Sequence, residues 1–163
     1  MWHTIFVAAH AVTATTALIT GVLTVVRSQL FGTYLGSLVA MEMFLVLAVS
    51  VQWSAYSWPA RAAFAALAAL GGVVVWQGLL AWQIRPPDGA SPSVRYFEHA
   101  GFTLVALVDA FLVVTVLDTG APGWAVAATG VLVALAGHFA LRIGRRWMVT
   151  DVYQSTTPAD AAA

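Results

Sequence analysis

Four titratable residues interrupt stretches of sequence that are otherwise apolar: His10, Glu42, Asp109 and His138. An acid at the middle of a membrane costs about 2.5–3.5 kcal/mol on insertion scales, so such residues are expected to face the interior of a helix bundle. A carboxyl held there is suited to carrying a proton or binding a cation, because its charge needs a compensating partner. We therefore predict a proton-, cation- or small-solute-binding set made of Glu42, Asp109 and His10.

Glu42 and Asp109 are expected at similar depths in the membrane. Counted from the same side, they lie about nine and about eleven residues into their apolar segments, and a helix rises ~1.5 Å per residue. The two carboxyls can then approach each other and hold one proton between them, since both cannot be ionised cheaply in a dry site. In the alternative interpretation, each acid is neutral and bonded to a threonine, Gln77 or a backbone carbonyl.

The histidines suggest a second site. His99 and His138 are expected at similar depths, with Glu98 directly beside His99. Imidazole and carboxylate groups bind haem iron and other metals, so these three residues form a candidate haem b or metal site. In the alternative interpretation they are solvated near the interface. His10 and His138 differ too much in depth to bind one haem iron from opposite sides.

The composition limits the class of protein. Of 163 residues, 61% are hydrophobic and only 9% are charged, whereas about a quarter are charged in soluble domains. Seven basic and seven acidic residues give no reason to expect a nucleic-acid partner. The absence of cysteine excludes disulfides and thiolate metal sites. No nucleophile–base pattern, phosphate loop or zinc-helix motif appears, so the sequence favours a protein that is not an enzyme.

Five apolar segments must position these side chains, and each is long enough to cross a bilayer, which takes about 20 residues. We predict membrane-spanning helices at about 4–26, 33–53, 62–83, 98–117 and 124–141. The predicted fold is an all-α, polytopic transmembrane helix bundle in one domain, residues 1–147. Residues 148–163 are small and polar and are predicted to form a short, disordered cytoplasmic tail.

The arginines predict an orientation. With five spans, Arg61 lies alone on one side and six arginines lie on the other: Arg27, Arg85, Arg95, Arg142, Arg145 and Arg146. The positive-inside rule then places the N-terminus outside and the C-terminus in the cytoplasm. We expect a multi-pass protein of the inner (plasma) membrane whose outer surface contacts lipid.

Small residues at helical spacing predict how the helices pack. Gly71 and Gly78 lie on one face of the third segment, and Gly130 and Gly137 on one face of the fifth. In lipid, such residues allow close approach between helices. If these faces contact other chains, the protein is a structural or assembly subunit, in a homo-oligomer or with other membrane subunits.

The first third of the chain resembles an uncharacterised bacterial multipass membrane protein family. The likeness consists of His10, Gly21 eleven residues later, Arg27, and the Gly-containing turn at 32–36. The chain lacks the His-Arg pair that the family places in this turn, and the resemblance implies no activity. The five-helix layout with its N-terminus outside also looks like the haem-bearing subunits of respiratory complexes, which pair histidines by depth on facing helices.

Overall fold

The computed structural model describes residues 1–24, 30–87, 90 and 92–156. It contains five α-helices joined by short connections: α1 (Trp2–Thr24), α2 (Phe31–Val51), α3 (Trp58–Gln83), α4 (Val94–Asp118) and α5 (Gly123–Thr156). Each has an apolar stretch long enough to cross a membrane, which in α5 is Gly123–Met148. The predicted all-α bundle of five apolar helices is confirmed, and it is the architecture of a multi-pass membrane protein.

Two helices begin four residues earlier than the sequence predicts. Helix α3 begins at Trp58, because Pro59 lies in its first turn, where the missing N–H of proline costs nothing. Helix α4 begins at Val94, because the Ser93 hydroxyl accepts a hydrogen bond from the Tyr96 N–H at 3.2 Å. Helix α4 ends before Gly120, whose φ of 74° allows the tight turn into α5.

The structure corrects the prediction for the start of the tail. Helix α5 continues to Thr156, so residues 148–156 are helical where the sequence predicts disorder. No proline or glycine lies between Gly144 and Pro158, and a helix can continue into water where nothing interrupts its backbone hydrogen bonds. Residues 157–163 of the predicted tail lie outside the described residues.

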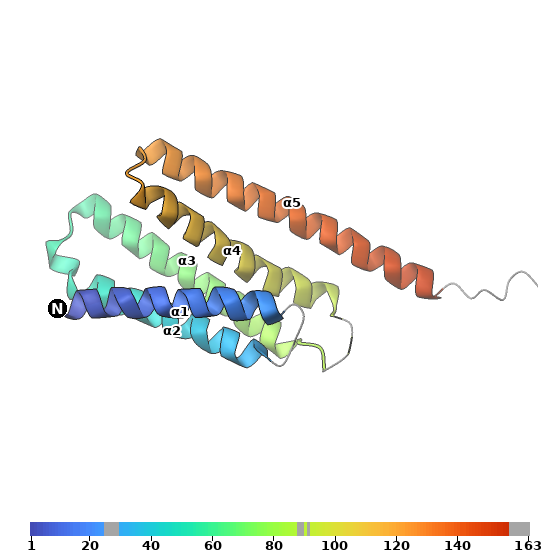
Figure 1. Cartoon of the computed structure of the whole chain (residues 1–163). Coiled ribbons are helices and arrows are strands. Elements are labelled where there is room, and N and C mark those ends of the chain that lie inside the picture. Colours follow the sequence, from blue (N-terminus) through green and yellow to red (C-terminus); the bar gives the residue numbers. More distant parts are fainter. Residues whose placement is uncertain (25–29, 88–89, 91, 157–163) are drawn as a thin grey trace, which may run out of the picture.

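The helices form two pairs that α3 connects (Figure 1). Helix α1 packs along α2, α5 packs along α4, and α3 lies between α2 and α4. Helix α1 also touches α4, whereas no residue in the apolar part of α5 is buried. The N-terminus and the end of α5 lie at opposite ends of the bundle, as an odd number of crossings requires.

The largest fully buried side chains lie in the first halves of α2 and α4. Phe31, Tyr34, Leu38 and Thr103 are almost fully buried. The Tyr34 hydroxyl donates a hydrogen bond of 2.6 Å to the Thr103 hydroxyl and so joins α2 to α4. The Tyr96 ring packs beside Phe31, with ring centroids 5.8 Å apart. A buried hydrogen bond and aromatic contacts therefore hold this end of the bundle together.

The four glycines of the predicted packing faces all lie at contacts within the chain. Gly137 receives the side chain of Val105, and Gly130 lies close to Val113, both from α4. Gly78 receives leucines of α2, and Gly71 receives Glu42. These glycines bring α3 and α5 close to their neighbours, so the faces they mark are used inside the bundle.

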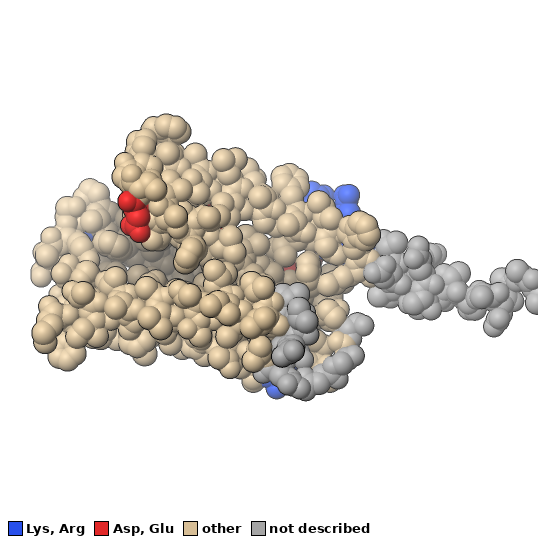
Figure 2. Space-filling model, in the orientation of Figure 1, with Lys and Arg blue, Asp and Glu red and all other residues tan. Residues whose placement is uncertain are grey.

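Charge is distributed unevenly along the bundle. Arg61 lies at the end that carries the N-terminus, and the other end carries Arg85, Arg95, Arg142, Arg145 and Arg146, while Arg27 lies outside the described residues. Basic side chains appear at that second end in the space-filling view (Figure 2). The flanks between the ends expose large apolar side chains such as Trp76 and Leu132, 60% and 65% exposed. Such flanks are suited to contact with lipid.

Candidate functional site

Glu42 lies near the middle of α2 and is the one charged residue of this helix. Its carboxyl lies against Gly71 of α3, so closely that the Cβ of any other residue at position 71 would overlap it. The carboxyl oxygen Oε2 is buried and has no hydrogen-bond partner among the described residues. A buried carboxyl oxygen without a partner is costly, so this position needs a compensating group.

Asp109 occupies a similar position on α4. Its Oδ1 atom is buried and also lacks a hydrogen-bond partner within the described residues. This oxygen lies 3.8 Å from the position that a Cβ at Gly130 of α5 would take. The two acids therefore face different helices, Glu42 toward α3 and Asp109 toward α5, and no hydrogen bond between them is found in the described part of the chain.

His10 connects α1 to α2 one residue away from Glu42. Its Nδ1 atom lies 2.9 Å from the carbonyl oxygen of Met41. Because a carbonyl only accepts, Nδ1 carries the hydrogen of this bond. His10 therefore holds α1 against the segment of α2 that bears Glu42, while Glu42 itself points toward α3.

Glu98 and His99 leave α4 in different directions. The Nδ1 atom of His99 lies 2.6 Å from the Gln77 side-chain oxygen on α3. The Glu98 carboxylate pairs with Arg145 of α5 at 2.9 Å. His138 is exposed on α5, with its ring near Phe139. The structure thus does not bring the three residues of the candidate haem or metal site together.

Within residues 1–24, 30–87, 90 and 92–156, no group of three or more His, Asp or Glu side chains is arranged to hold a metal ion. The haem hypothesis needs the imidazoles of His99 and His138 on facing helices. His99 is already bonded to α3, and His138 faces outward, so the geometry gives no support to the haem hypothesis.

The sequence does not indicate which residues close the arginine-rich end of the bundle, the end that carries Arg85, Arg95 and the arginines of α5. The Arg85 guanidinium lies 3.6 Å from the centroid of the Trp82 ring, which packs on Phe31. The buried hydrogen bond between Tyr34 and Thr103 is likewise not among the contacts that the sequence predicts. A tyrosine four residues inside an apolar helix is a usable signal, since a buried phenol normally finds a partner. The identity of that partner depends on tertiary contacts alone.

Comparisons of the chain with protein-family models, with curated proteins and with solved structures gave no match. The resemblance of the first third of the chain to an uncharacterised bacterial family stays a prediction. The geometry of the interior polar groups is therefore what bears on the function of this protein.

Proposed function

We propose that this multi-pass membrane protein transfers protons, with Glu42 and Asp109 as the interior proton-binding groups and His10 as a positioning residue. One observation carries the proposal: each acid has a buried carboxyl oxygen without a hydrogen-bond partner among the described residues. An unpaired charge costs several kcal/mol in a low-dielectric interior, so each carboxyl requires a proton or another cation there.

A proton fits these sites better than a metal cation. Calcium and magnesium take about six or more oxygen ligands, whereas a proton needs one oxygen. Glu42 faces a glycine of α3 and Asp109 a glycine of α5, neither of which brings a second side-chain oxygen. The described residues contain no cluster of three ligands that would complete a metal site.

Polar groups at other depths support the same function. His3 and Tyr56 lie within 3.5 Å of each other at the end that carries the N-terminus. His10 follows about 10 Å further along α1, at ~1.5 Å per residue. The Gln77–His99 pair lies between the level of Glu42 and the arginine-rich end. Protonatable groups thus occur on both sides of the midplane, as a proton path requires.

We further propose that the N-terminus faces outward and the arginine-rich end faces the cytoplasm. Arg85, Arg95 and the arginines of α5 share one end of the bundle, and such a bias marks the cytoplasmic side. The inner (plasma) membrane is the location that this orientation fits.

Proteoliposome flux tests the function. Protein is reconstituted with an internal pH-sensitive dye, a potassium diffusion potential is imposed, and proton entry is followed. We expect flux above that of empty liposomes, and a loss of at least about tenfold in Glu42→Gln and Asp109→Asn. The matched control is Glu98→Gln, which makes the same change on an exposed acid and is expected to retain flux. Flux equal to empty liposomes, or unaffected by both interior variants, would falsify the proposal.

A second candidate, a subunit of a larger membrane assembly, is supported by His138. This imidazole is exposed near the middle of the apolar part of α5, where a polar ring facing lipid is unfavourable unless another chain covers it. The mass of the purified protein in mild detergent tests this candidate. A monomer in wild type and His138→Leu alike would exclude it, and a larger assembly that His138→Leu dissociates would support it.

A further inference from the structure

The helices pack closely at one end of the bundle and loosely at the other. Helix α1 has no buried residue before Ala17, α3 has none before Val74, and α4 has none after Leu107. Each of these helices therefore buries its residues from about its middle toward the arginine-rich end. Toward the N-terminal end, the described residues that are buried are Ala48 and Val49, both on α2.

Leu38 closes the tightly packed part of the bundle next to Glu42. It is fully buried and lies one turn of α2 from Glu42, on the same face and toward the arginine-rich end. The Cδ1 atoms of Leu35 and Leu38 lie 3.1 and 3.3 Å from the position that a Cβ at Gly78 would take. Gly71, on the same face of α3, receives Glu42. At the α2–α3 contact, the two leucines thus form the layer that adjoins the acid.

Three other helices add apolar side chains to this layer. Ala17 of α1, Val74 of α3 and Leu107 of α4 belong to one buried cluster with Leu38, and none of the four is more than 6% exposed. Water is not stabilised among side chains that offer it no polar partner. The cluster therefore separates Glu42 from the arginine-rich end.

A cavity at the arginine-rich end stops short of Leu38. Its volume is about 490 Å³, and its lining includes Phe31 and Tyr34 of α2 but not Leu38, which lies one turn further along the helix. Water in this cavity therefore reaches Tyr34, and the buried cluster lies between that point and Glu42.

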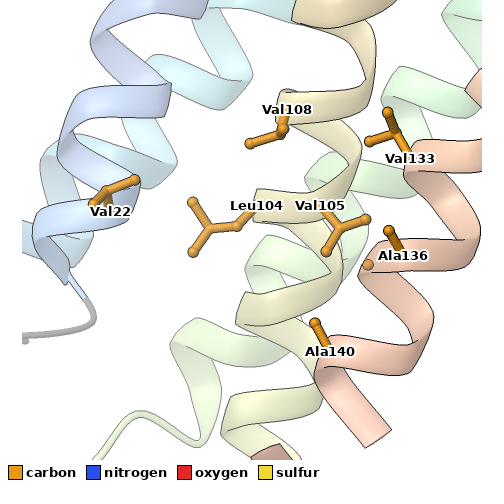
Figure 3. Close-up of a pocket in the computed structure, with 8 residues that line it drawn as sticks. Val22, Leu104, Val105, Val108, Val133, Ala136 and Ala140 are labelled. Atoms are coloured by element: carbon orange, nitrogen blue, oxygen red, sulfur yellow. The ribbon is translucent and has the colours of Figure 1, made fainter. Parts of the chain in front are cut away.

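The hollow on the flank of the bundle, where α1 and α5 border α4, is not a route for water (Figure 3). It has a volume of about 360 Å³, and the described residues that line it are all aliphatic or glycine, including Val22, Leu104 and Val133. Apolar hollows of this kind stay dry, so this flank is suited to lipid rather than to a proton path.

Polar side chains lie between Glu42 and the N-terminal end. His10 is hydrogen-bonded to the α2 backbone one residue from Glu42. His3 and Tyr56 are half-buried and lie 3.5 Å apart. The Nε atom of Arg61 is buried and has no partner among the described residues, and a buried N–H of this kind is normally satisfied by water. This end of the bundle is therefore suited to water, unlike the apolar cluster on the other side of the acid.

We infer that Glu42 is open to water from the N-terminal side of the membrane and that Leu38 closes it off from the arginine-rich side. The inference deepens the proposed function and, as a statement about proton transfer, rests on it. A proton bound at Glu42 exchanges with the N-terminal side until Leu38 moves away from Gly78. Leu38 is therefore the residue that sets the side from which Glu42 is loaded.

Side-specific thiol labelling of the full chain tests the inference, because the chain contains no cysteine and each introduced thiol is unique. A sulfonated methanethiosulfonate reagent, which reacts in water and does not cross the bilayer, is added to sealed vesicles whose orientation is known from a C-terminal tag. We expect Glu42→Cys to react at least about tenfold faster from the N-terminal side, since the apolar cluster excludes a charged reagent. The matched control is Met43→Cys at the same depth, 52% exposed on the outer face of α2, which should react from neither side.

Leu38→Ser in the Glu42→Cys background tests the closing residue. The smaller side chain with its hydroxyl admits water, so labelling from the arginine-rich side should rise at least about fivefold. The matched control is Leu141→Ser, the same change at a leucine that packs against Gly101 in the α4–α5 contact, which should leave this labelling unchanged. Leu35→Ser, at the same contact with Gly78, repeats the test if Leu38→Ser does not fold.

Three results overturn the inference: labelling of Glu42→Cys that is as fast or faster from the arginine-rich side, no labelling from the N-terminal side, or labelling from the arginine-rich side that neither leucine variant raises. Labelling does not require transport. The expected labelling pattern in a protein without proton flux would therefore contradict the proposed function and still support the one-sided access of Glu42.

Discussion

Glu42 and Asp109 both lie against a glycine of the neighbouring helix, and the two contacts differ in closeness. At Gly71 the position of a Cβ would lie 2.6 Å from the carboxyl carbon of Glu42. At Gly130 the nearest carboxyl oxygen of Asp109 is 3.8 Å from the equivalent position, an ordinary van der Waals distance. Glu42 therefore depends on the glycine of the opposite helix, whereas Asp109 has room for a small side chain there.

The substitution Gly71→Ala should have the largest effect. The new methyl overlaps the Glu42 carboxyl, so the far end of this flexible side chain must turn away or helix α3 must shift, at a cost of up to about 3 kcal/mol. We expect proton flux to fall as far as in Glu42→Gln, together with a lower thermal unfolding midpoint in detergent. Wild-type flux in Gly71→Ala would show that the position of Glu42 is not critical.

The double variant Glu42→Ala/Gly71→Ala separates packing from chemistry. Once the carboxyl is removed, the methyl at position 71 meets empty space, so the stability lost in Gly71→Ala should return. We expect a coupling of about 0.5–3 kcal/mol between the two positions in a double-mutant cycle of unfolding in detergent. Proton flux should stay low, because no carboxyl remains on α2. Additive stability losses would contradict the contact described here.

Gly130→Ala makes the same change at the other acid and should have a small effect. The added methyl meets Val113 at 3.4 Å and Asp109 at 3.8 Å, and alanine favours a helix over glycine by up to about 1 kcal/mol. We expect flux close to wild type and an unfolding midpoint that is unchanged or slightly raised. A loss as large as that of Gly71→Ala would remove the distinction between the two acids.

Glu98→Gln should have the smallest effect of the four. It breaks an exposed ion pair with Arg145, and such pairs contribute about 0–1 kcal/mol. Unfolding in detergent at low and high salt checks this, since screening should remove the small difference that remains. A large loss of stability would mean that the charges of this end contribute more than the interior acids.

The five helices could be predicted from the sequence because each needs only a sufficient run of apolar residues. The predicted ends of the helices are less accurate. In the sequence, Pro59 predicts a break before the third helix, but in the structure it lies within the first turn of α3. Ser93 extends α4 backward through a local hydrogen bond that composition does not reveal.

The depths of Glu42 and Asp109 along their helices could also be predicted, but not the helices they face. In α2 and α4, apolar residues surround each acid, so no polar stripe indicates which face turns inward. His10 bonds to a backbone carbonyl, which every residue offers, and the partner is therefore invisible in the sequence. His99 and His138 illustrate the same limit, since depth alone does not say whether two rings face each other.

The late position of helix α4 in the chain affects how the protein assembles during its synthesis. The chain is made from its N-terminus, so α1, α2 and α3 enter the membrane before α4 exists. Until then the Tyr34 hydroxyl lacks Thr103 and the Gln77 amide lacks His99. These groups must be satisfied by water or by the insertion machinery in the meantime. Arrival of α4 thus completes the first three helices as well as adding a fourth, and a fragment truncated before Val94 should be an early target of membrane quality control.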